Sequence, residues 1–251
     1  MIDTHCHLDL AAFDVDRAGV LARAVAAGVR GIVVPAIRMR PKSIDHPLVR
    51  VALGVHPQIV PELDAIERAL DPERLAADAI AAGACAIGEC GLDGGTAERE
   101  LQEQLFRVQI RAARLAKLPL VVHVLRAHDA APKILREELA HEVGGVLHSY
   151  SGGAELVPSY ARLGFAFSFA GPVTYPNARK PIEAARAVPA ELLLAETDAP
   201  DQAPANHRGE RSEPAYVADV IAGLSAARGE DVAAACDANA LRVFGSWGPW
   251  V

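Results

Sequence analysis

Eight short apolar segments recur along the chain, and helical or loop patterns separate them. Each segment is a continuous apolar run rather than an alternation, which is the pattern of strands buried on both faces of a parallel sheet. The segments cover residues 2–5, 31–34, 51–55, 85–89, 120–123, 145–148, 165–169 and 192–196. This repetition within 251 residues predicts an α/β fold, a (β/α)8 TIM barrel that forms one domain over residues 1–251.

The segments between the apolar runs carry the spacing of amphipathic helices. The clearest covers residues 97–117, and the helix expected at 14–27 has Asp14 as its N-cap and Gly28 at its end. Residues 35–50 contain three prolines, so any helix there should be short or absent. Further helices are expected at 128–140, 153–163, 177–187, 213–227 and 230–244.

Net charge and hydrophobicity limit the partners of the chain. The net charge is −7 with neutral histidines, so a broad basic surface for coating a duplex is not expected, although bound metal ions would add local positive charge. No apolar run reaches the roughly 18 residues of a membrane span, and the N-terminus lacks a signal-peptide pattern. We therefore expect a cytoplasmic protein without a membrane segment, with a monomer as its simplest assembly.

Imidazoles and carboxylates stand where the predicted strands end. The carboxyl ends of all barrel strands meet at one face, where active sites lie. A single buried histidine is more often a core residue than a ligand, but several such groups at one rim would be costly without a cation. The residues in question are His5, His7, Glu89, His123, His148 and Asp198. The sequence therefore predicts a metal centre at the mouth of the barrel.

The residue types suit one or two divalent ions. His5 and His7 alternate along a strand and point the same way, so both imidazoles can bind one ion. Glu89 has two oxygens and could bridge two ions. Asp198 could bind an ion and accept a proton from water, whose pKa a metal lowers from roughly 15.7 to about 7. Glu89 and Asp198 are thus the predicted catalytic residues, and Zn, Mg, Mn and Fe are all candidate metals.

Six motifs occur in an order that resembles one protein family. They are Ile2-Asp3-Thr4-His5-Cys6-His7-Leu8-Asp9, Gly54-Val55-His56-Pro57, Gly88-Glu89-Cys90-Gly91-Leu92-Asp93, Leu118-Pro119-Leu120-Val121-Val122-His123, His148-Ser149-Tyr150-Ser151-Gly152 and Glu196-Thr197-Asp198-Ala199-Pro200. In this order they resemble the TatD family of metal-dependent hydrolases, within the amidohydrolase-type barrel superfamily. Ala127-His128-Asp129 and Val173-Thr174-Tyr175-Pro176 resemble the YjjV-like branch of that family.

The resemblance implies two metal positions at the barrel mouth. The first ion would be held by His5, His7, Glu89 and Asp198, and the second by Glu89, His123 and His148. The implied activity is that of a metal-dependent deoxyribonuclease or 3′–5′ exonuclease. Its substrate would be DNA ends or single-stranded DNA.

Four further residues are candidates for substrate binding, each with a structural alternative. His56 ends the third predicted strand and either faces the site or hydrogen-bonds a loop. Asp93 either orients a ligand histidine or caps the following helix. Arg126 and Arg208 could bind phosphate oxygens, although a solvated side chain is an equal alternative for Arg208. Gly94-Gly95 departs from the family pattern, as does the short connection after the second strand, and both flank the predicted rim.

The predicted metal centre is compatible with three hypotheses about function. The first is a phosphodiester hydrolase acting on DNA, although aromatic residues, at 5%, offer few platforms for stacked bases. The second is a hydrolase of small-molecule amides, esters or lactones, since the same chemistry attacks a carbonyl carbon. The third is a barrel retained as a partner-binding subunit, and the complete set of predicted ligands argues against it.

Overall fold

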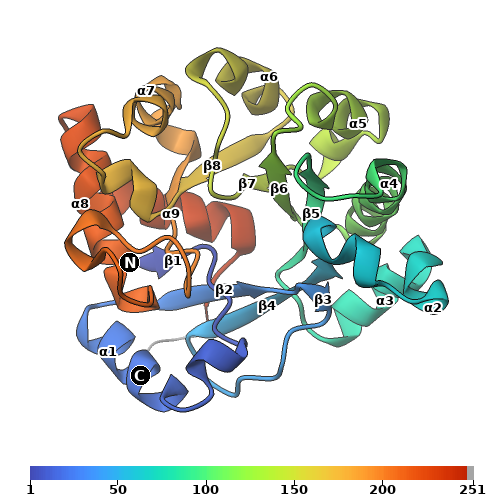
Figure 1. Ribbon diagram of the computed structural model, residues 1–251, viewed down its shortest axis with the longest axis horizontal. Helices are drawn as coiled ribbons and strands as arrows, with labels where there is room; N and C mark the ends of the chain where they lie inside the picture. The colour runs from blue at the N-terminus through green and yellow to red at the C-terminus, as the bar shows by residue number, and fades with distance from the viewer. Residues whose placement is uncertain (248–251) are drawn as a thin grey trace.

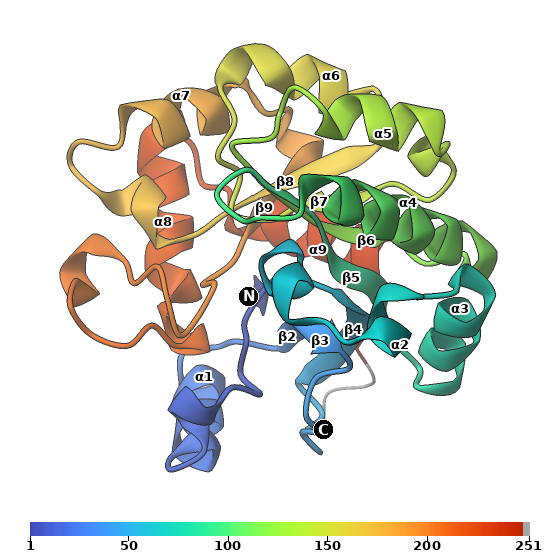
Figure 2. The ribbon, with the colours of Figure 1, turned by 45° about the vertical axis from the view of Figure 1, so that its right-hand side comes forward.

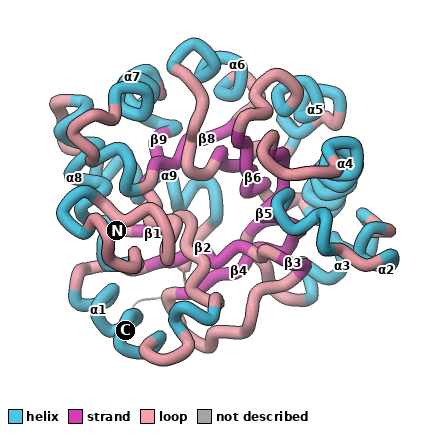
Figure 3. Tube along the Cα trace, in the orientation of Figure 1, coloured by secondary structure: helices cyan, strands magenta, loops and turns pink. Residues whose placement is uncertain are grey.

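The computed structural model describes residues 1–247, and over this range eight parallel strands form a nearly closed barrel surrounded by helices (Figure 1, Figure 3). The parallel strands are β1 (Ile2–Asp3), β2 (Gly31–Pro35), β4 (Val49–Val55), β5 (Ala86–Asp93), β6 (Leu120–Leu125), β7 (Gly145–Leu147), β8 (Phe165–Phe169) and β9 (Leu193–Ala195). They lie in the order in which they occur in the chain, and β3 (Arg38–Met39) pairs antiparallel with β4. The predicted (β/α)8 barrel is confirmed.

Backbone hydrogen bonds draw together the segments that follow the first and last strands. The amide of His7 donates to the carbonyl of Ala199 over 2.8 Å. The amide of Asp198 donates to the carbonyl of His5 over 2.9 Å. These hydrogen bonds bring the two edges of the nearly closed barrel together, and they place the two histidines after β1 beside the aspartate after β9.

Helices cover the outside of the barrel and connect its strands (Figure 2). They are α1 (Arg17–Ala26), α2 (Ala65–Arg68), α3 (Pro72–Ala81), α4 (Arg99–Ala116), α5 (Ala131–Glu137), α6 (Val157–Ala161), α7 (Arg179–Ala187), α8 (Val217–Arg228) and α9 (Ala233–Phe244). Each predicted helix overlaps one of these, whereas α2 and α3 lie in a connection for which no helix was predicted. Within residues 1–247, no helix combines the length and the apolar character that crossing a membrane requires.

The start of α1 corrects one expectation. The helix begins at Arg17 with Asp16 at the N-cap position, and Asp14 forms an ion pair with Arg17 over 2.6 Å instead of capping the helix. The predicted end is confirmed, because Gly28 follows the helix with a φ of +84°, a conformation that glycine adopts without strain.

The strands separate a small inner layer from a larger outer core. Side chains alternate between the faces of a strand, so Val33 packs in the inner layer while Ile32 and Val34 pack in the outer core. The inner layer takes one residue from each parallel strand, namely Ile2, Val33, Ala52, Ala86, Val121, Val146, Ala166 and Leu194. Phe244 of α9 packs against this layer, and α9 lies behind the strands in Figure 1. One end of the barrel is therefore closed by apolar residues.

Candidate metal centre

Two histidines of the site face the barrel interior because side chains alternate along a strand. His123 lies two residues beyond Val121 of the inner apolar layer, and His148 lies two residues beyond Val146. Each imidazole therefore points into the barrel immediately beyond the apolar layer, toward the carboxyl ends of the strands. This is the end at which barrel enzymes hold their active sites.

An irregularity in β5 turns Glu89 into the same space. Glu89 lies three residues beyond Ala86 of the inner layer, so strict alternation would point its side chain outward. The pairing register of β5 with β6 shifts between Ile87 and Cys90. Such a bulge inserts a residue and re-aims a side chain, often beside an active site. The shift therefore accounts for a carboxylate inside the barrel at this position.

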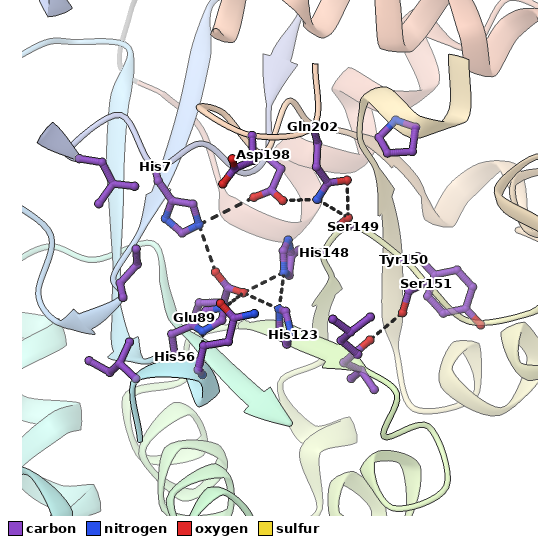
Figure 4. Close-up of a pocket in the computed structure, with 18 of the residues that line it drawn as sticks. His7, His56, Glu89, His123, His148, Ser149, Tyr150, Ser151, Asp198 and Gln202 are labelled. Carbon is purple, nitrogen blue, oxygen red and sulfur yellow. Dashed lines mark hydrogen bonds and ion pairs between the residues drawn. The ribbon is translucent and has the colours of Figure 1, made fainter. Parts of the chain in front are cut away.

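One oxygen of the Glu89 carboxylate faces the two histidines that follow β1, of which Figure 4 labels His7. Glu89 is completely buried, and its Oε2 lies 3.1 Å from Nε2 of His5 and 3.5 Å from Nε2 of His7. Oδ1 of Asp198 lies 3.5 Å and 3.8 Å from the same two nitrogens. Two imidazole nitrogens and two carboxylate oxygens thus converge on one small volume, and such a donor set suits a divalent cation.

The other oxygen of Glu89 faces three imidazoles. Its Oε1 lies 2.8 Å from Nε2 of both His56 and His148, and 3.0 Å from Nδ1 of His123. The inward nitrogens of His123 and His148 are themselves 3.0 Å apart. Glu89 therefore stands between two clusters of nitrogen atoms, with one cluster at each of its oxygens.

Burial and neighbouring charges set the ionisation of the centre. Burial opposes the charge of Glu89, but the surrounding imidazoles, led by His148, outweigh it and hold the pKa of this carboxyl well below its usual range. Burial and a neighbouring imidazole lower the pKa of His7 to about 3, so this ring is neutral. Burial also raises the pKa of Asp198 to about 6. At neutral pH the centre thus offers ionised carboxylates and a neutral imidazole.

Two carboxylates face the outer nitrogens of two rings. Oε1 of Glu196 lies 3.5 Å from Nδ1 of His148, and Oδ2 of Asp93 lies 3.4 Å from Nε2 of His123. A carboxylate favours a proton on the nitrogen that faces it, so the inward nitrogen of a neutral ring has the lone pair. Burial opposes the charge of both rings, but Asp93 and Glu89 raise the pKa of His123, and Glu89 and Glu196 raise the pKa of His148 well above its usual range, so a bound cation would take the place of a proton on each ring. His123 and His148 can therefore donate that lone pair to a metal.

His56 has the opposite arrangement. Its Nδ1 accepts a hydrogen bond from the backbone amide of Gln58 over 3.0 Å. Burial lowers the pKa of His56, so the ring is neutral and its single proton lies on Nε2, which faces Glu89. His56 thus donates a hydrogen bond to the carboxylate instead of offering a lone pair to a cation.

The buried polar atoms of the centre fit a bound cation. Within residues 1–247, the buried Oε2 of Glu89 has no hydrogen-bond donor, which is costly for a carboxylate oxygen inside a barrel. Three groups bring their donor atoms within 4.8 Å of one another, namely His5 with His7 and Glu89, His5 with His148 and Asp198, and His56 with Glu89 and His123. The imidazole and carboxylate donors are those that Zn, Mn and Fe accept.

A cavity of about 510 Å³ opens over the two clusters (Figure 4). Part of its wall is apolar and comes from loops near the strand ends, with Leu10, Ile37, Ile59, Leu125 and Pro172 among the lining residues. In the described part of the chain, no lysine or arginine lines this cavity. Apart from the imidazoles, positive charge at the bottom of the cavity would therefore have to come from bound cations.

The structure gathers the six predicted metal ligands but disperses the predicted substrate residues. His56 lines the cavity, whereas Asp93 is buried outside its lining. Arg126 and Arg208 are both exposed, and neither lines the cavity. The Arg208 guanidinium lies 5.4 Å from the centre of the Tyr175 ring, which is a cation–π contact.

The surroundings of Asp93 decide between its two predicted structural roles. Its Oδ2 faces His123, and its Oδ1 accepts the amide of Gly95 over 2.7 Å. The following helix begins only at Arg99, with Glu98 at its N-cap position. Of the two alternatives for Asp93, the helix cap is excluded, and the position of its Oδ2 beside His123 is compatible with a carboxylate that orients this histidine.

Three polar residues close to the centre were not predicted from the sequence. The amide of Ser149 donates to Oε1 of Glu196 over 2.5 Å, and Nε2 of Gln202 donates to Oδ2 of Asp198. Glu196 carried a usable signal, because it is a carboxylate that ends an apolar run. Ser149 and Gln202 lie in loops, where no periodicity indicates the direction of a side chain.

Comparisons with known proteins agree with this geometry. The family model described as TatD related DNase matches residues 2–245. The chain is 36% identical to the uncharacterized metal-dependent hydrolase YabD of Bacillus subtilis, over 97% of this chain and 98% of that protein. It is 32% identical to the 3′-5′ ssDNA/RNA exonuclease TatD of Escherichia fergusonii, over 98% and 99% of the two chains.

A solved structure matches the whole barrel. The crystal structure of YjjV, a TatD homologue from Escherichia coli K12, superposes with a TM-score of 0.87 and 30% identity over 98% of both chains. The likeness thus extends beyond the fold to sequence, and the resemblance seen in the motifs is confirmed. The chain belongs to the TatD family of metal-dependent hydrolases.

Proposed function

We propose that the protein removes nucleotides from the 3′ ends of single-stranded DNA by metal-dependent hydrolysis of phosphodiester bonds. The observation that carries this proposal is the Glu89 carboxylate, which has a separate cluster of imidazole nitrogens at each oxygen. A carboxylate in this position suits two adjacent cations that clamp a phosphodiester. The relative named as a 3′-5′ ssDNA/RNA exonuclease, at 32% identity, supports nucleic acid as the substrate.

We assign the ligands of two metal positions from the two clusters. The first position would be held by His5, His7, Glu89 and Asp198, and the second by Glu89, His123 and His148. His56 is left out because its proton lies on the nitrogen that faces Glu89. A divalent ion supplies Lewis acidity when bound, since it promotes the ionisation of water and neutralises charge that develops on the phosphate.

The two carboxylates of the centre, Asp198 and Glu89, have different roles in proton transfer. Asp198, whose pKa burial raises to about 6, is ionised at neutral pH and still basic enough to accept a proton from the attacking water. It can then return that proton to the leaving oxygen. Glu89, whose pKa lies well below its usual range, stays ionised and holds its place between the clusters. We therefore propose Asp198 as the general base and Glu89 as the bridging ligand.

The cavity admits the end of a strand. Its volume of about 510 Å³ falls in the range of about 300–1,000 Å³ that is usual for ligand sites. A nucleotide at a chain end can enter such a space, whereas the stacked interior of a duplex cannot. His56, which lines the cavity, is the predicted substrate residue in reach of that end.

A second candidate function is the hydrolysis of a small, uncharged ester, amide or lactone. The observation that favours it is the cavity wall, which includes Leu10, Ile37 and Ile59 and, within residues 1–247, no lysine or arginine. Such a wall favours binding of an apolar part of a substrate, and it offers no lysine or arginine to pair with a chain of phosphates. The same metal-dependent chemistry would act on a carbonyl carbon.

The test compares the two substrate classes in one preparation. Metal-free protein is reloaded with Zn²⁺, Mn²⁺ or Mg²⁺ and incubated with a 5′-labelled single-stranded oligonucleotide and, separately, with p-nitrophenyl esters and a lactone. The proposal expects a ladder of products shortened from the 3′ end. It also expects that His5→Ala and Asp198→Ala abolish the ladder while the exposed control His141→Ala retains it.

The results separate the candidates. Turnover of the esters or the lactone without an oligonucleotide ladder would replace the nuclease proposal by the second candidate. Equal oligonucleotide cleavage by wild type and by His5→Ala would assign the activity to a contaminating nuclease and would refute the proposal.

A further inference from the structure

We infer that Gln202 is a positioning residue that holds the Asp198 carboxylate toward the first histidine cluster. The inference rests on the proposed function, because it concerns the residue assigned there as general base. Gln202 lies in the loop after β9, lines the cavity and is partly exposed. Its side chain nevertheless makes hydrogen bonds to two residues of the site.

The hydrogen bonds fix the orientation of the Gln202 amide. Its Nε2 donates to Oδ2 of Asp198, and it lies 2.8 Å from Oγ of Ser149. An ionised carboxylate only accepts hydrogen bonds, so the nitrogen of the amide must face Asp198. The amide oxygen then accepts the Ser149 hydroxyl over 3.0 Å. Both ends of the amide are therefore engaged.

Because of this contact, the two Asp198 oxygens have different partners. Oδ2 is held by Gln202, and Oδ1 is left facing Nε2 of His5 and of His7, at 3.5 Å and 3.8 Å. If Gln202 could not donate, the carboxylate could rotate about its terminal torsion, which is broad for aspartate. The oxygen that faces the histidines would then no longer be fixed.

The backbone around these residues supports a role in the site. Asp198, Ser149 and Gln202 have φ values of +49°, +40° and +53°, a region that residues other than glycine seldom adopt. Such conformations persist where surrounding structure holds them, and they concentrate at functional sites. Here the residues that share the hydrogen-bond network also share this unusual backbone.

The network reaches the second cluster as well. The Ser149 amide donates to Oε1 of Glu196 over 2.5 Å, and that oxygen lies 3.5 Å from Nδ1 of His148. Gln202 therefore connects the loop that carries Asp198 to the loop that follows β7. A change at Gln202 should disturb both proposed metal positions. The effect should be larger at the first position, which Asp198 would help to hold.

The experiment replaces the amide by an apolar side chain of similar length. Gln202→Met is compared with wild type and with Gln104→Met, the same substitution on the exposed face of α4. Zn²⁺ affinity of the metal-free full-length protein is measured by calorimetry, and kcat and KM are measured on a single-stranded oligonucleotide. Loss of a residue that orients a ligand typically costs about 10- to 100-fold in metal affinity or activity.

The expected result is a loss of that size in Zn²⁺ affinity or kcat for Gln202→Met, with KM unchanged and with Gln104→Met equal to wild type. Circular dichroism checks folding, and if Gln202→Met does not fold, Ser149→Ala is titrated instead. Zn²⁺ affinity and kcat equal to those of Gln104→Met would overturn the inference, and so would a rise in KM alone, which marks a substrate contact.

The two proposals fail in different ways. A wild type that binds Zn²⁺ but does not cleave the oligonucleotide refutes the nuclease proposal, and the Zn²⁺ titration then decides the inference by itself. A wild type that binds no Zn²⁺, Mn²⁺ or Mg²⁺ overturns both.

Discussion

Replacing His56 by leucine separates the two roles that its position allows, hydrogen-bond donor and metal ligand. His56 is only 7% exposed, and its Nε2 lies 2.8 Å from Oε1 of Glu89 while its Nδ1 accepts the Gln58 amide over 3.0 Å. Leucine fills a similar volume and makes neither hydrogen bond. If His56 is a donor, the substitution destabilises the protein but leaves the metal ligands in place.

The expected loss follows from the two hydrogen bonds. A bond to an ionised group contributes about 1.5–3 kcal/mol and an ordinary one about 1 kcal/mol, so His56→Leu should lower the free energy of unfolding by about 2.5–4 kcal/mol. In a protein of this size, each kcal/mol shifts Tm by about 2–4 °C, which gives a fall of about 5–16 °C for the metal-free protein.

The assay combines thermal unfolding of the metal-free protein with elemental analysis after reloading. His123→Leu is the matched comparison, because His123 offers its inward lone pair whereas His56 presents a proton. We expect the metal content per chain to fall in His123→Leu and to stay at the wild-type level in His56→Leu. The tautomer argument is refuted if His56→Leu loses as much metal as His123→Leu, or if its Tm is unchanged.

Two further predictions concern the surroundings of the centre. A Cβ added at Gly91, where φ is +137°, would lie 2.0 Å from the carbonyl oxygen of His123, so Gly91→Ala should cost more than the about 1–3 kcal/mol of backbone strain alone. At Gly83, where φ is +62°, an added Cβ would meet nothing within 4 Å, so Gly83→Ala gives the cost of a positive φ without a clash. Equal losses of unfolding free energy for the two variants, measured by urea unfolding, would contradict the predicted clash at Gly91. Burial, with help from Lys180, lowers the pKa of His128 from 6.5 to about 4; the unfolded state therefore binds more protons in this interval, and stability should fall as the pH falls from 6.5 to about 4. The decline should be shallower in His128→Gln, and identical stability–pH curves would count against this assignment.

The barrel could be predicted from the sequence because continuous apolar runs report burial on both faces of a strand. The same logic identified the metal ligands, since His123 and His148 interrupt apolar runs where a core residue would otherwise stand. Glu89 was found because it is a carboxylate at the end of a predicted strand. Its inward direction depends on the register shift in β5, and nothing in the local pattern of residues 85–89 predicts that shift.

The missed helices and the misplaced substrate residues have different causes. α3 had a start signal, because Asp71 precedes Pro72 and its side chain caps the amide of Arg74 over 2.8 Å, as an aspartate before a proline often does. Arg126 and Arg208 carry guanidinium groups, which can bind phosphate oxygens. Both lie in loops, however, and the direction of a loop side chain depends on tertiary contacts that one sequence does not encode locally.

Chemistry and substrate choice come from different parts of this fold. The carboxylate of Glu89 and the imidazole of His123 project from the paired strands β5 and β6, and His148 follows β7 directly, so the barrel fixes the geometry of all three. The apolar wall comes from loops near the strand ends, at positions such as Leu10 and Ile59, and loops accept substitution without disturbing the strands. Exchange of wall residues should therefore change which bond is cleaved, and metal affinity should stay the same. The absence of lysine and arginine from the cavity lining, within residues 1–247, is thus the feature on which the choice between a phosphodiester and an uncharged ester depends most directly.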